Sequence, residues 1–252
     1  MLINPALPSP APFIANGTVF SRLDGCNTTA AISSDVTINN IKRNLKRNYP
    51  RLHDLEEFKK IKNEPIALIG GGPSIKSRLQ EINKFKNKIA CGSVHDYLVE
   101  NNIFCEYAVV CDPDPISANY FRNPVKYTKY LVSTGCDEEV YKILNNYNIF
   151  MWHCFSEELL KTPIEDNFSA IGGGCTVGLR AMSIALVLGY SEFHFFGFDS
   201  CLEVNKNNKI AHHAYDFSDK SEELGVLYKV GVGTDKEIDQ TKEFICAGYH
   251  IA

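Results

Sequence analysis

The sequence lacks the features that would place the protein in a membrane, outside the cell or on nucleic acid. No apolar run reaches the length of about 18 residues that a membrane span needs, and the first residues lack the basic-then-apolar pattern of a signal peptide. Neither sign of charge dominates, because 26 Lys and Arg stand against 30 Asp and Glu, for a net charge of −4. We therefore expect no membrane association and no sequence-specific nucleic-acid partner, and any contact with a polyanion must be local.

Cysteine is present in nine copies, but no CxxC pair occurs. An odd number of cysteines, several of them inside apolar runs, indicates reduced, buried thiols in a cytoplasmic protein. Because no closely spaced pair of ligands faces a second pair, the spacing gives no sign of a structural zinc site, although His and Cys side chains could still converge in the fold. No cysteine is flanked by residues that mark an activated thiolate, and no Gly-x-Ser-x-Gly elbow occurs.

The 252 residues suit one α/β domain preceded by an extension. Residues 1–35 are rich in Pro, Ser, Thr and Asn and predict a flexible tail. Residues 36–64 predict a helical lead-in, with a short amphipathic helix that ends before Pro50 and whose basic face is either solvated or in contact with phosphate. We expect residues 65–252 to form the main domain. Its last segment, 241–252, reads as a helix that is cut short.

From residue 65 onward, short apolar runs alternate with longer segments that suit helices. Runs of four or five residues without clean alternation are typical of strands that are covered on both faces. The runs are 66–69, 88–91, 107–111, 130–133, 149–152 and 193–196. The expected crossover helices lie within 75–86, 94–101, 137–146 and 175–189. This alternation predicts a Rossmann-like α/β fold, with a mostly parallel sheet and helices on both faces.

A glycine-rich turn, Gly70-Gly71-Gly72-Pro73-Ser74, follows the first strand directly. At the carboxyl end of a parallel strand, glycines let backbone amides approach a phosphate, and the following helix favours negative charge. Ser74 can cap that helix or bind the phosphate. The turn lacks the third glycine of the dinucleotide fingerprint and the Lys-Ser/Thr of a P-loop, so a tight turn without any ligand remains the alternative.

A second glycine turn, Gly172-Gly173-Gly174-Cys175-Thr176, opens a helix that contains only one charge. Such a helix must be buried, and its first amides then face the interior cleft. Gly173, Gly174 and Thr176 are therefore candidates for nucleotide binding, although we expect Thr176 to act mainly as the N-cap.

The residues after the second strand are expected at the same carboxyl edge of the sheet as the first glycine turn. Ser93, His95 and Asp96 are positioned to contact a base or a ribose, and Asp96 has the alternative role of capping the next helix.

Carboxylates follow two further strands. Asp112 and Asp114 can hold Mg²⁺ that bridges nucleotide phosphates, although Asp-Pro is also common in turns. Asp199 follows the last strand, and His213 and Tyr215 come about a dozen residues later. These three side chains are the candidates for orienting or deprotonating an acceptor and for donating to phosphate.

The ordered set of motifs resembles the 6-hydroxymethylpterin diphosphokinase MptE-like family, which occurs in archaea, bacteria and phages. The resemblance extends from about Asn39 to Gly248 and includes Ile69-Gly-Gly-Gly-Pro-Ser74, Asp112, Gly173-Gly-Cys-Thr-Val-Gly178 and Phe196-Gly-Phe-Asp199. It implies ATP near Gly71 to Ser74, Mg²⁺ near Asp112, and transfer of diphosphate to a pterin alcohol.

The same layout is similar to bacterial sialyltransferases that have a Gly-x-Gly-Pro-Ser loop. That similarity implies a metal-independent reaction of a nucleotide sugar, in which His213 and Tyr215 would assist the departing nucleotide. We therefore expect a transferase that binds a nucleotide and a small-molecule acceptor. A glycosyltransferase is the first alternative, and a non-catalytic nucleotide-binding phage protein is the second. A homo-oligomer is compatible with the sequence.

Overall fold

The computed structural model describes residues 34–155, 170–173 and 176–199, together with the backbone of the strands at 13–15, 18–20, 201–204, 210–211, 227–229 and 244–247. The chain divides into two compact units. The larger unit comprises Ala30–Asp199 and His213–Tyr215, and the smaller one comprises Met1–Thr29, Ser200–His212 and Asp216–Ala252.

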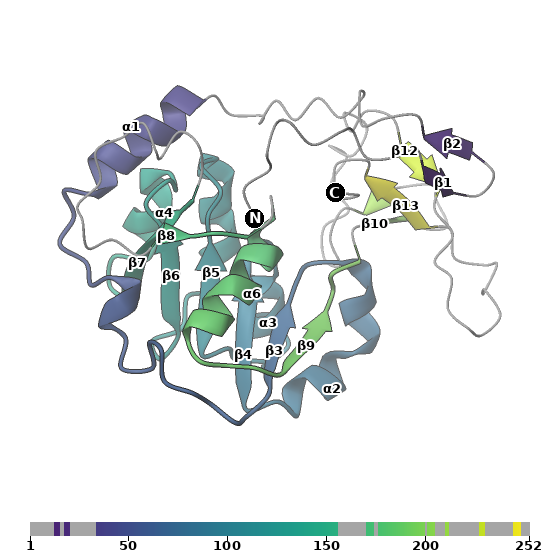
Figure 1. Ribbon diagram of the computed structural model, residues 1–252, viewed down its shortest axis with the longest axis horizontal. Coiled ribbons are helices and arrows are strands. Elements are labelled where there is room, and N and C mark those ends of the chain that lie inside the picture. Colours follow the sequence, from purple (N-terminus) through teal and green to yellow (C-terminus); the bar gives the residue numbers. More distant parts are fainter. Residues whose placement is uncertain are drawn as a thin grey trace. The chain divides into compact units, whose positions relative to one another are not determined.

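The larger unit is built on a seven-stranded parallel sheet, with the order β8-β7-β6-β5-β4-β3-β9 (Figure 1). Its strands are β3 (Ile66–Ile69), β4 (Asn87–Cys91), β5 (Tyr107–Val110), β6 (Lys129–Ser133), β7 (Asn148–Cys154), β8 (Ala170–Ile171) and β9 (Phe193–Phe196). All six runs predicted as strands form strands, and every pairing between neighbours is parallel. The predicted Rossmann-like α/β fold is therefore confirmed.

Short helices follow most of the strands. The α-helices are α1 (Ser34–Asn44), α2 (Leu79–Asn83), α3 (His95–Glu100), α4 (Glu138–Ile143) and α6 (Val177–Val187). The 3-10 helices are η1 (Leu52–Asp54), η2 (Pro73–Ser77), η3 (Gly92–Val94) and η4 (Pro115–Phe121). Each predicted crossover segment contains a helix. None of the helices in the described part of the chain has both the length and the apolar character needed to cross a membrane.

Two apolar cores cover the two faces of the sheet. Successive residues of a strand point to opposite faces, so Ile69 packs with Ile82 and Leu98 in one core, while Leu68 packs with Ile184 in the other. Both faces are buried by helices, and this explains why the strands show no alternation of apolar and polar residues.

The path of the chain through the sheet brings its first and last strands together. The strands from β3 to β8 follow one another across the sheet, and the chain then passes through α6 to place β9 beside β3. The order of the strands therefore reverses between β3 and β9. In open α/β sheets, a crevice for ligands forms outside the carboxyl ends of the strands at such a switch point.

The smaller unit contains antiparallel strands. β1 (Phe13–Ala15) pairs with β2 (Thr18–Phe20). A four-stranded sheet has the order β11-β10-β13-β12, with β10 (Cys201–Val204), β11 (Ile210–Ala211), β12 (Leu227–Lys229) and β13 (Phe244–Ala247). The helix expected over 241–252 is wrong for Phe244–Ala247, because this apolar run pairs as a strand with both β10 and β12. Periodicity alone does not separate a short apolar strand from part of a buried helix.

Candidate functional site

The glycine turn after β3 lies against the turn after β9. The Gly70 amide donates to the Phe196 carbonyl at 2.7 Å, and the Gly72 amide donates to the Gly197 carbonyl at 2.9 Å. Ser74 completes the contact, because its amide and its hydroxyl donate to the two carboxylate oxygens of Asp199 at 2.7 and 2.6 Å. The switch point is therefore closed by direct bonds between the two strand ends.

Glycine is required here because the two backbones approach so closely. A Cβ atom on Gly70 would lie 2.5 Å from the Gly197 carbonyl oxygen, and one on Gly72 would lie 2.5 Å from an Asp199 carboxylate oxygen. Gly197 has a φ of +67°, which side chains rarely tolerate. The glycines thus have a packing role of their own, beside the phosphate contact that the sequence predicts for them.

The structure also locates the other candidates in this turn. Pro73 is buried at the start of η2, Gly71 is half-buried, and the Ser74 side chain is exposed. Because Asp199 occupies both donors of Ser74, a phosphate that bound to Ser74 would have to displace the carboxylate. Asp199 therefore holds the turn in this structure.

Asp112 and Asp114 form two successive turns after β5. A carboxylate oxygen of Asp112 accepts the Asp114 amide at 3.0 Å, and one of Asp114 accepts the Ile116 amide at 2.8 Å, which caps η4. Partial burial and, to a smaller extent, the charge of Asp114 raise the pKa of Asp112, while the Asp114 amide opposes the shift. One oxygen of each side chain is left for a further ligand.

This pair fits Mg²⁺ only in part. Magnesium is commonly held by one or two carboxylates, with water and substrate phosphate oxygens as the remaining ligands. Within the described ranges, no group of three or more His, Cys, Asp or Glu side chains is arranged to hold a metal ion. The two aspartates are therefore suited to a shared, substrate-dependent site rather than to a complete protein cage.

The second glycine turn is described in part. As predicted, Thr176 is the N-cap of α6, and its Oγ1 accepts the Leu179 amide at 3.3 Å. Gly173 has a φ of +132°, and a Cβ atom there would lie 3.0 Å from the Ser183 hydroxyl. Gly174 lies outside the described residues, so its nucleotide contact stays a prediction.

The structure separates Ser93 from its two neighbours. His95 and Asp96 are buried and bond to each other at 2.9 Å, and the second ring nitrogen of His95 lies 3.1 Å from the Tyr130 hydroxyl. Asp96 also accepts the Arg122 amide at 2.9 Å, so it ties α3 to the loop after η4 instead of capping its own helix. Ser93 is half-buried in η3 and is the one of the three that remains accessible to a ligand.

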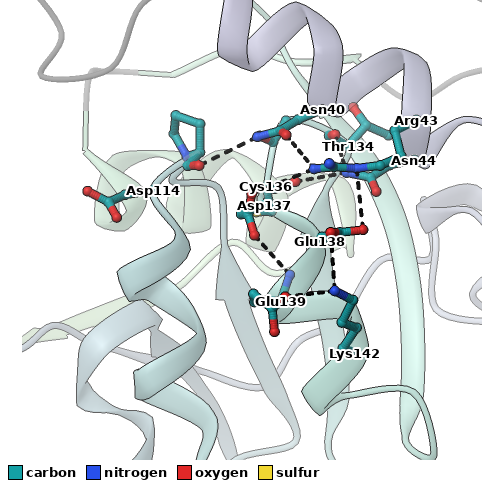
Figure 2. A network of polar contacts seen from close by, with 12 residues as sticks. Asn40, Arg43, Asn44, Asp114, Thr134, Cys136, Asp137, Glu138, Glu139 and Lys142 are labelled. Atoms are coloured by element: carbon teal, nitrogen blue, oxygen red, sulfur yellow. Dashed lines mark hydrogen bonds and ion pairs between the residues drawn. The ribbon is translucent and has the colours of Figure 1, made fainter.

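Two buried asparagines join α1 to the carboxyl edge of the sheet (Figure 2). Neither was predicted from the sequence. The Asn44 side-chain amide donates to the carbonyls of Thr134 and Cys136 at 2.9 and 2.8 Å. The Asn40 amide donates to the Gly135 carbonyl at 3.1 Å and more weakly, at 3.5 Å, to the carbonyl between Asp112 and Asp114. We call Asn40 and Asn44 the asparagine clamp.

The basic face of α1 is partly docked rather than simply solvated. Arg43 donates to the side-chain oxygen of Asn40 and lies 3.6 Å from Asp137 and 4.0 Å from Glu138 (Figure 2). Arg47 donates to the Asn44 side-chain oxygen at 3.0 Å. The signal in the sequence was the spacing of the asparagines by four residues on the face that also carries Ile41.

His213 and Tyr215 lie outside the described residues. Their predicted roles at this edge of the sheet remain predictions.

Comparison with known proteins identifies one family and several solved structures that match this chain. The model of the 6-hydroxymethylpterin diphosphokinase MptE-like family matches residues 36–205. Among curated proteins, none matches the sequence significantly.

Two of the matching solved structures are a bacterial glycosyltransferase and a mammalian sialyltransferase. The MAf glycosyltransferase from Magnetospirillum magneticum AMB-1 matches 84% of this chain with a TM-score of 0.59 and 16% identity. The chain covers only 32% of that structure's length. A mammalian sialyltransferase in complex with Gal-beta-1-3GalNAc-ortho-nitrophenol matches 75% of this chain and 78% of its own, with a TM-score of 0.39 and 11% identity.

Proposed function

Because the chain belongs to the 6-hydroxymethylpterin diphosphokinase MptE-like family, we propose that it transfers diphosphate from ATP to a small alcohol such as a hydroxymethylpterin. The observation that carries this proposal is the glycine turn at the switch point between β3 and β9, on the edge of the sheet that also carries Asp112. Family membership supports a nucleotide-related transferase, and the geometry supplies an edge where phosphates and an acceptor can meet.

In the proposed reaction, the hydroxyl oxygen of the acceptor attacks the β-phosphorus of ATP. A new bond forms between this oxygen and phosphorus, the bond from the β-phosphorus to the bridging oxygen of the α-phosphate breaks, and AMP leaves. The hydroxyl proton passes to a base or to solvent. Such a reaction depends mainly on positioning and on neutralisation of charge, and both can be supplied by groups fixed at one edge.

Each candidate has a distinct task in this scheme. Gly71 would present its backbone amide to the phosphates, while the bonds from Gly72 to Gly197 and from Ser74 to Asp199 fix the shape of the turn. Ser93 would contact the base or the ribose, and Gly173, Gly174 and Thr176 would contribute from the start of α6. His213 and Tyr215 would act on the acceptor or on phosphate.

Asp112 and Asp114 would hold Mg²⁺ through their remaining oxygens. The ion, when bound, neutralises the charge that develops on the phosphates. Burial is the main cause that raises the pKa of Asp112, and the charge of Asp114 adds a smaller part, which a bound cation would offset.

The test is incubation of the protein with ATP, Mg²⁺ and a hydroxymethylpterin, followed by chromatographic separation of AMP from ADP. We expect AMP release that requires the alcohol, is stopped by EDTA and is abolished in Asp112→Asn. Asp137→Asn is the matched control, because Asp137 also caps a helix at this edge and asparagine keeps that cap. Release of ADP, or nucleotide binding without turnover, would contradict the proposal.

A glycosyltransferase that uses a nucleotide sugar is the second candidate. Its support is the likeness in fold to the MAf glycosyltransferase, together with the sialyltransferase-like order of the motifs. In this case transfer from a nucleotide sugar would continue in the presence of EDTA, and Asp112→Asn would retain activity. The same pair of measurements therefore separates the two reactions.

A further inference from the structure

The ring of Phe198 lies between the first glycine turn and the first turn of α6. A Cβ atom on Gly70 would lie 3.3 Å from the Cδ2 atom of this ring. A Cβ atom on Gly178 would lie 2.5 Å from its Cε1 atom and 2.8 Å from its Cζ atom. Because Cδ2 and Cε1 are on opposite edges of the ring, Phe198 fills the space between the two glycines. Glycine at position 178 leaves room for the ring where any other residue would meet it.

This space belongs to the switch point of the sheet. Gly70 directly follows β3, and Phe198 is the second residue after β9, the strand that lies beside β3 (Figure 1). A crevice for ligands is expected outside the carboxyl ends of the strands at this point. Backbone hydrogen bonds from Gly70 and Gly72 already join the two turns, and the ring fills the side that faces α6. A side chain of the protein itself therefore occupies part of the crevice.

The ring is held at the margin of the core rather than inside it. Phe198 is half-buried, whereas Phe196, the last residue of β9, is 5% exposed and anchors the strand in the core on the opposite face. The ring meets Phe195 edge-on, with 5.2 Å between the ring centroids, and the Phe195 side chain is 48% exposed. Gly197 separates Phe198 from the strand and has a φ of +67°. Phe198 can therefore leave the crevice without opening the core.

We propose that Phe198 determines which ligands enter the crevice, because its ring occupies the space that the base of a nucleotide needs. The role of Phe198 rests on the proposed function, which places a nucleotide at the same edge of the sheet. A phosphate group alone does not need this space, since it is proposed to bind at Gly71, which is half-buried. A base enters only in the molecules whose ring has moved away, and the apparent affinity for a nucleotide is reduced to that fraction.

Isothermal titration calorimetry of the full-length protein with AMP and, separately, with inorganic pyrophosphate, which has no base, tests this role. We expect Phe198→Ala to bind AMP about tenfold more tightly than the original protein, while its affinity for pyrophosphate changes less than about twofold. Phe104→Ala is the matched control, because it removes an exposed phenylalanine at the other edge of the sheet, shortly before β5. Its affinities for both ligands should be unchanged.

Phe198→Leu keeps the measurement possible if the alanine variant does not fold. Leucine ends at its Cδ atoms, so it keeps the packing towards Gly70 but lacks the Cε1 and Cζ atoms that meet Gly178. Its affinity for AMP should lie between those of the original protein and Phe198→Ala.

Urea unfolding shows whether the ring occupies this place in solution. In the original protein, Gly178→Ala adds a methyl group that clashes with the ring, so we expect a lower urea midpoint. In the Phe198→Ala background the same methyl group meets no ring, and alanine favours a helix more than glycine does, so the midpoint should rise. Unequal shifts in the two backgrounds indicate contact between residues 178 and 198, and they do not depend on any ligand.

Four results would each overturn the role of Phe198. They are an affinity for AMP that stays the same or falls in Phe198→Ala, an equal gain for pyrophosphate, the same gain in Phe104→Ala, and equal shifts of the urea midpoint by Gly178→Ala in the two backgrounds. Failure of the proposed function gives a different result. In that case AMP would not be released from ATP with a hydroxymethylpterin, although the gain in affinity for AMP in Phe198→Ala would persist.

Discussion

Ser74 and Asp199 join the ends of two strands that are far apart in the sequence but adjacent in the sheet. The carboxylate accepts the Ser74 amide at 2.7 Å and the Ser74 hydroxyl at 2.6 Å. A side chain from the last strand end of the sheet thus occupies the donors of the turn that the sequence assigns to phosphate. Binding of an anion to Ser74 and retention of Asp199 are therefore competing states of the same turn.

The first prediction concerns this bond. Asp199→Ala should lower the free energy of unfolding by about 1–2 kcal/mol, because it leaves the Ser74 amide and hydroxyl without their acceptor. Asp199→Asn keeps one acceptor oxygen and should cost less. Urea unfolding of the three proteins measures the difference, and an alanine variant as stable as the original protein would contradict this role for Asp199.

The second prediction separates two glycines. In Gly197→Ala, the new methyl group would lie 2.4 Å from the Gly70 carbonyl oxygen at a φ of +67°, so we expect a loss of about 3 kcal/mol or more. Gly172→Ala is the control, because a Cβ atom there meets nothing within 4 Å. Its unfolding free energy should change by less than about 0.5 kcal/mol. Equal effects of the two substitutions in urea unfolding would show that the close approach is unimportant.

The third prediction concerns the asparagine clamp. Asn44→Ala removes the donor to two carbonyls in a buried position and should cost about 2–3 kcal/mol of unfolding free energy. Asn39→Ala on the same helix changes an exposed side chain and should be nearly neutral. Chemical denaturation compares the two variants. If they were equally stable, α1 would not depend on the clamp for its position.

The fourth prediction concerns acid sensitivity. Burial, aided by the charge of Arg51, lowers the pKa of His153 from 6.5 to about 4, so the folded protein binds fewer protons than the unfolded chain between these two values. The stability that is present above about pH 6.5 is therefore lost as the pH falls, by about 2 kcal/mol at pH 5.

A variant isolates the contribution of His153. His153→Gln removes the titrating ring, so its unfolding free energy should depend less on pH between 7 and 5 than that of the original protein. Urea titrations at the two pH values give the comparison. A variant with the same pH dependence would assign the effect to other groups.

Local sequence pattern was sufficient to predict the strands and the fold class. The apolar run at 66–69 is short and unbroken, because helices bury both faces of the sheet there, whereas the edge strand at 193–196 buries only Phe196 fully. That these two runs pair with each other was not predictable from local pattern, since the order of strands depends on which crossovers pack. β8 is only two residues long and gives no periodic signal.

The contacts that build the candidate site could not be predicted from the sequence. The glycine turn and Asp199 were identified as separate strand-end features, but the bond from Ser74 to Asp199 depends on β9 lying beside β3. The asparagine clamp likewise depends on α1 lying against the turn after β6. Such relationships are set by the tertiary fold rather than by the residues near each of these side chains.

The position of β9 also sets the order in which the molecule can assemble. Ser74 and Asp199 are 125 residues apart, and every other strand of the parallel sheet is synthesised before the strand that precedes Asp199. Closing so long a loop costs chain entropy before the contacts between β3 and β9 can offset that cost. We therefore expect it to be a late and slow step of folding. During synthesis, a ribosome-bound chain can therefore form the β3–β4–β5 region while its glycine turn is still without its carboxylate partner. The turn takes its final form only when the last strand arrives.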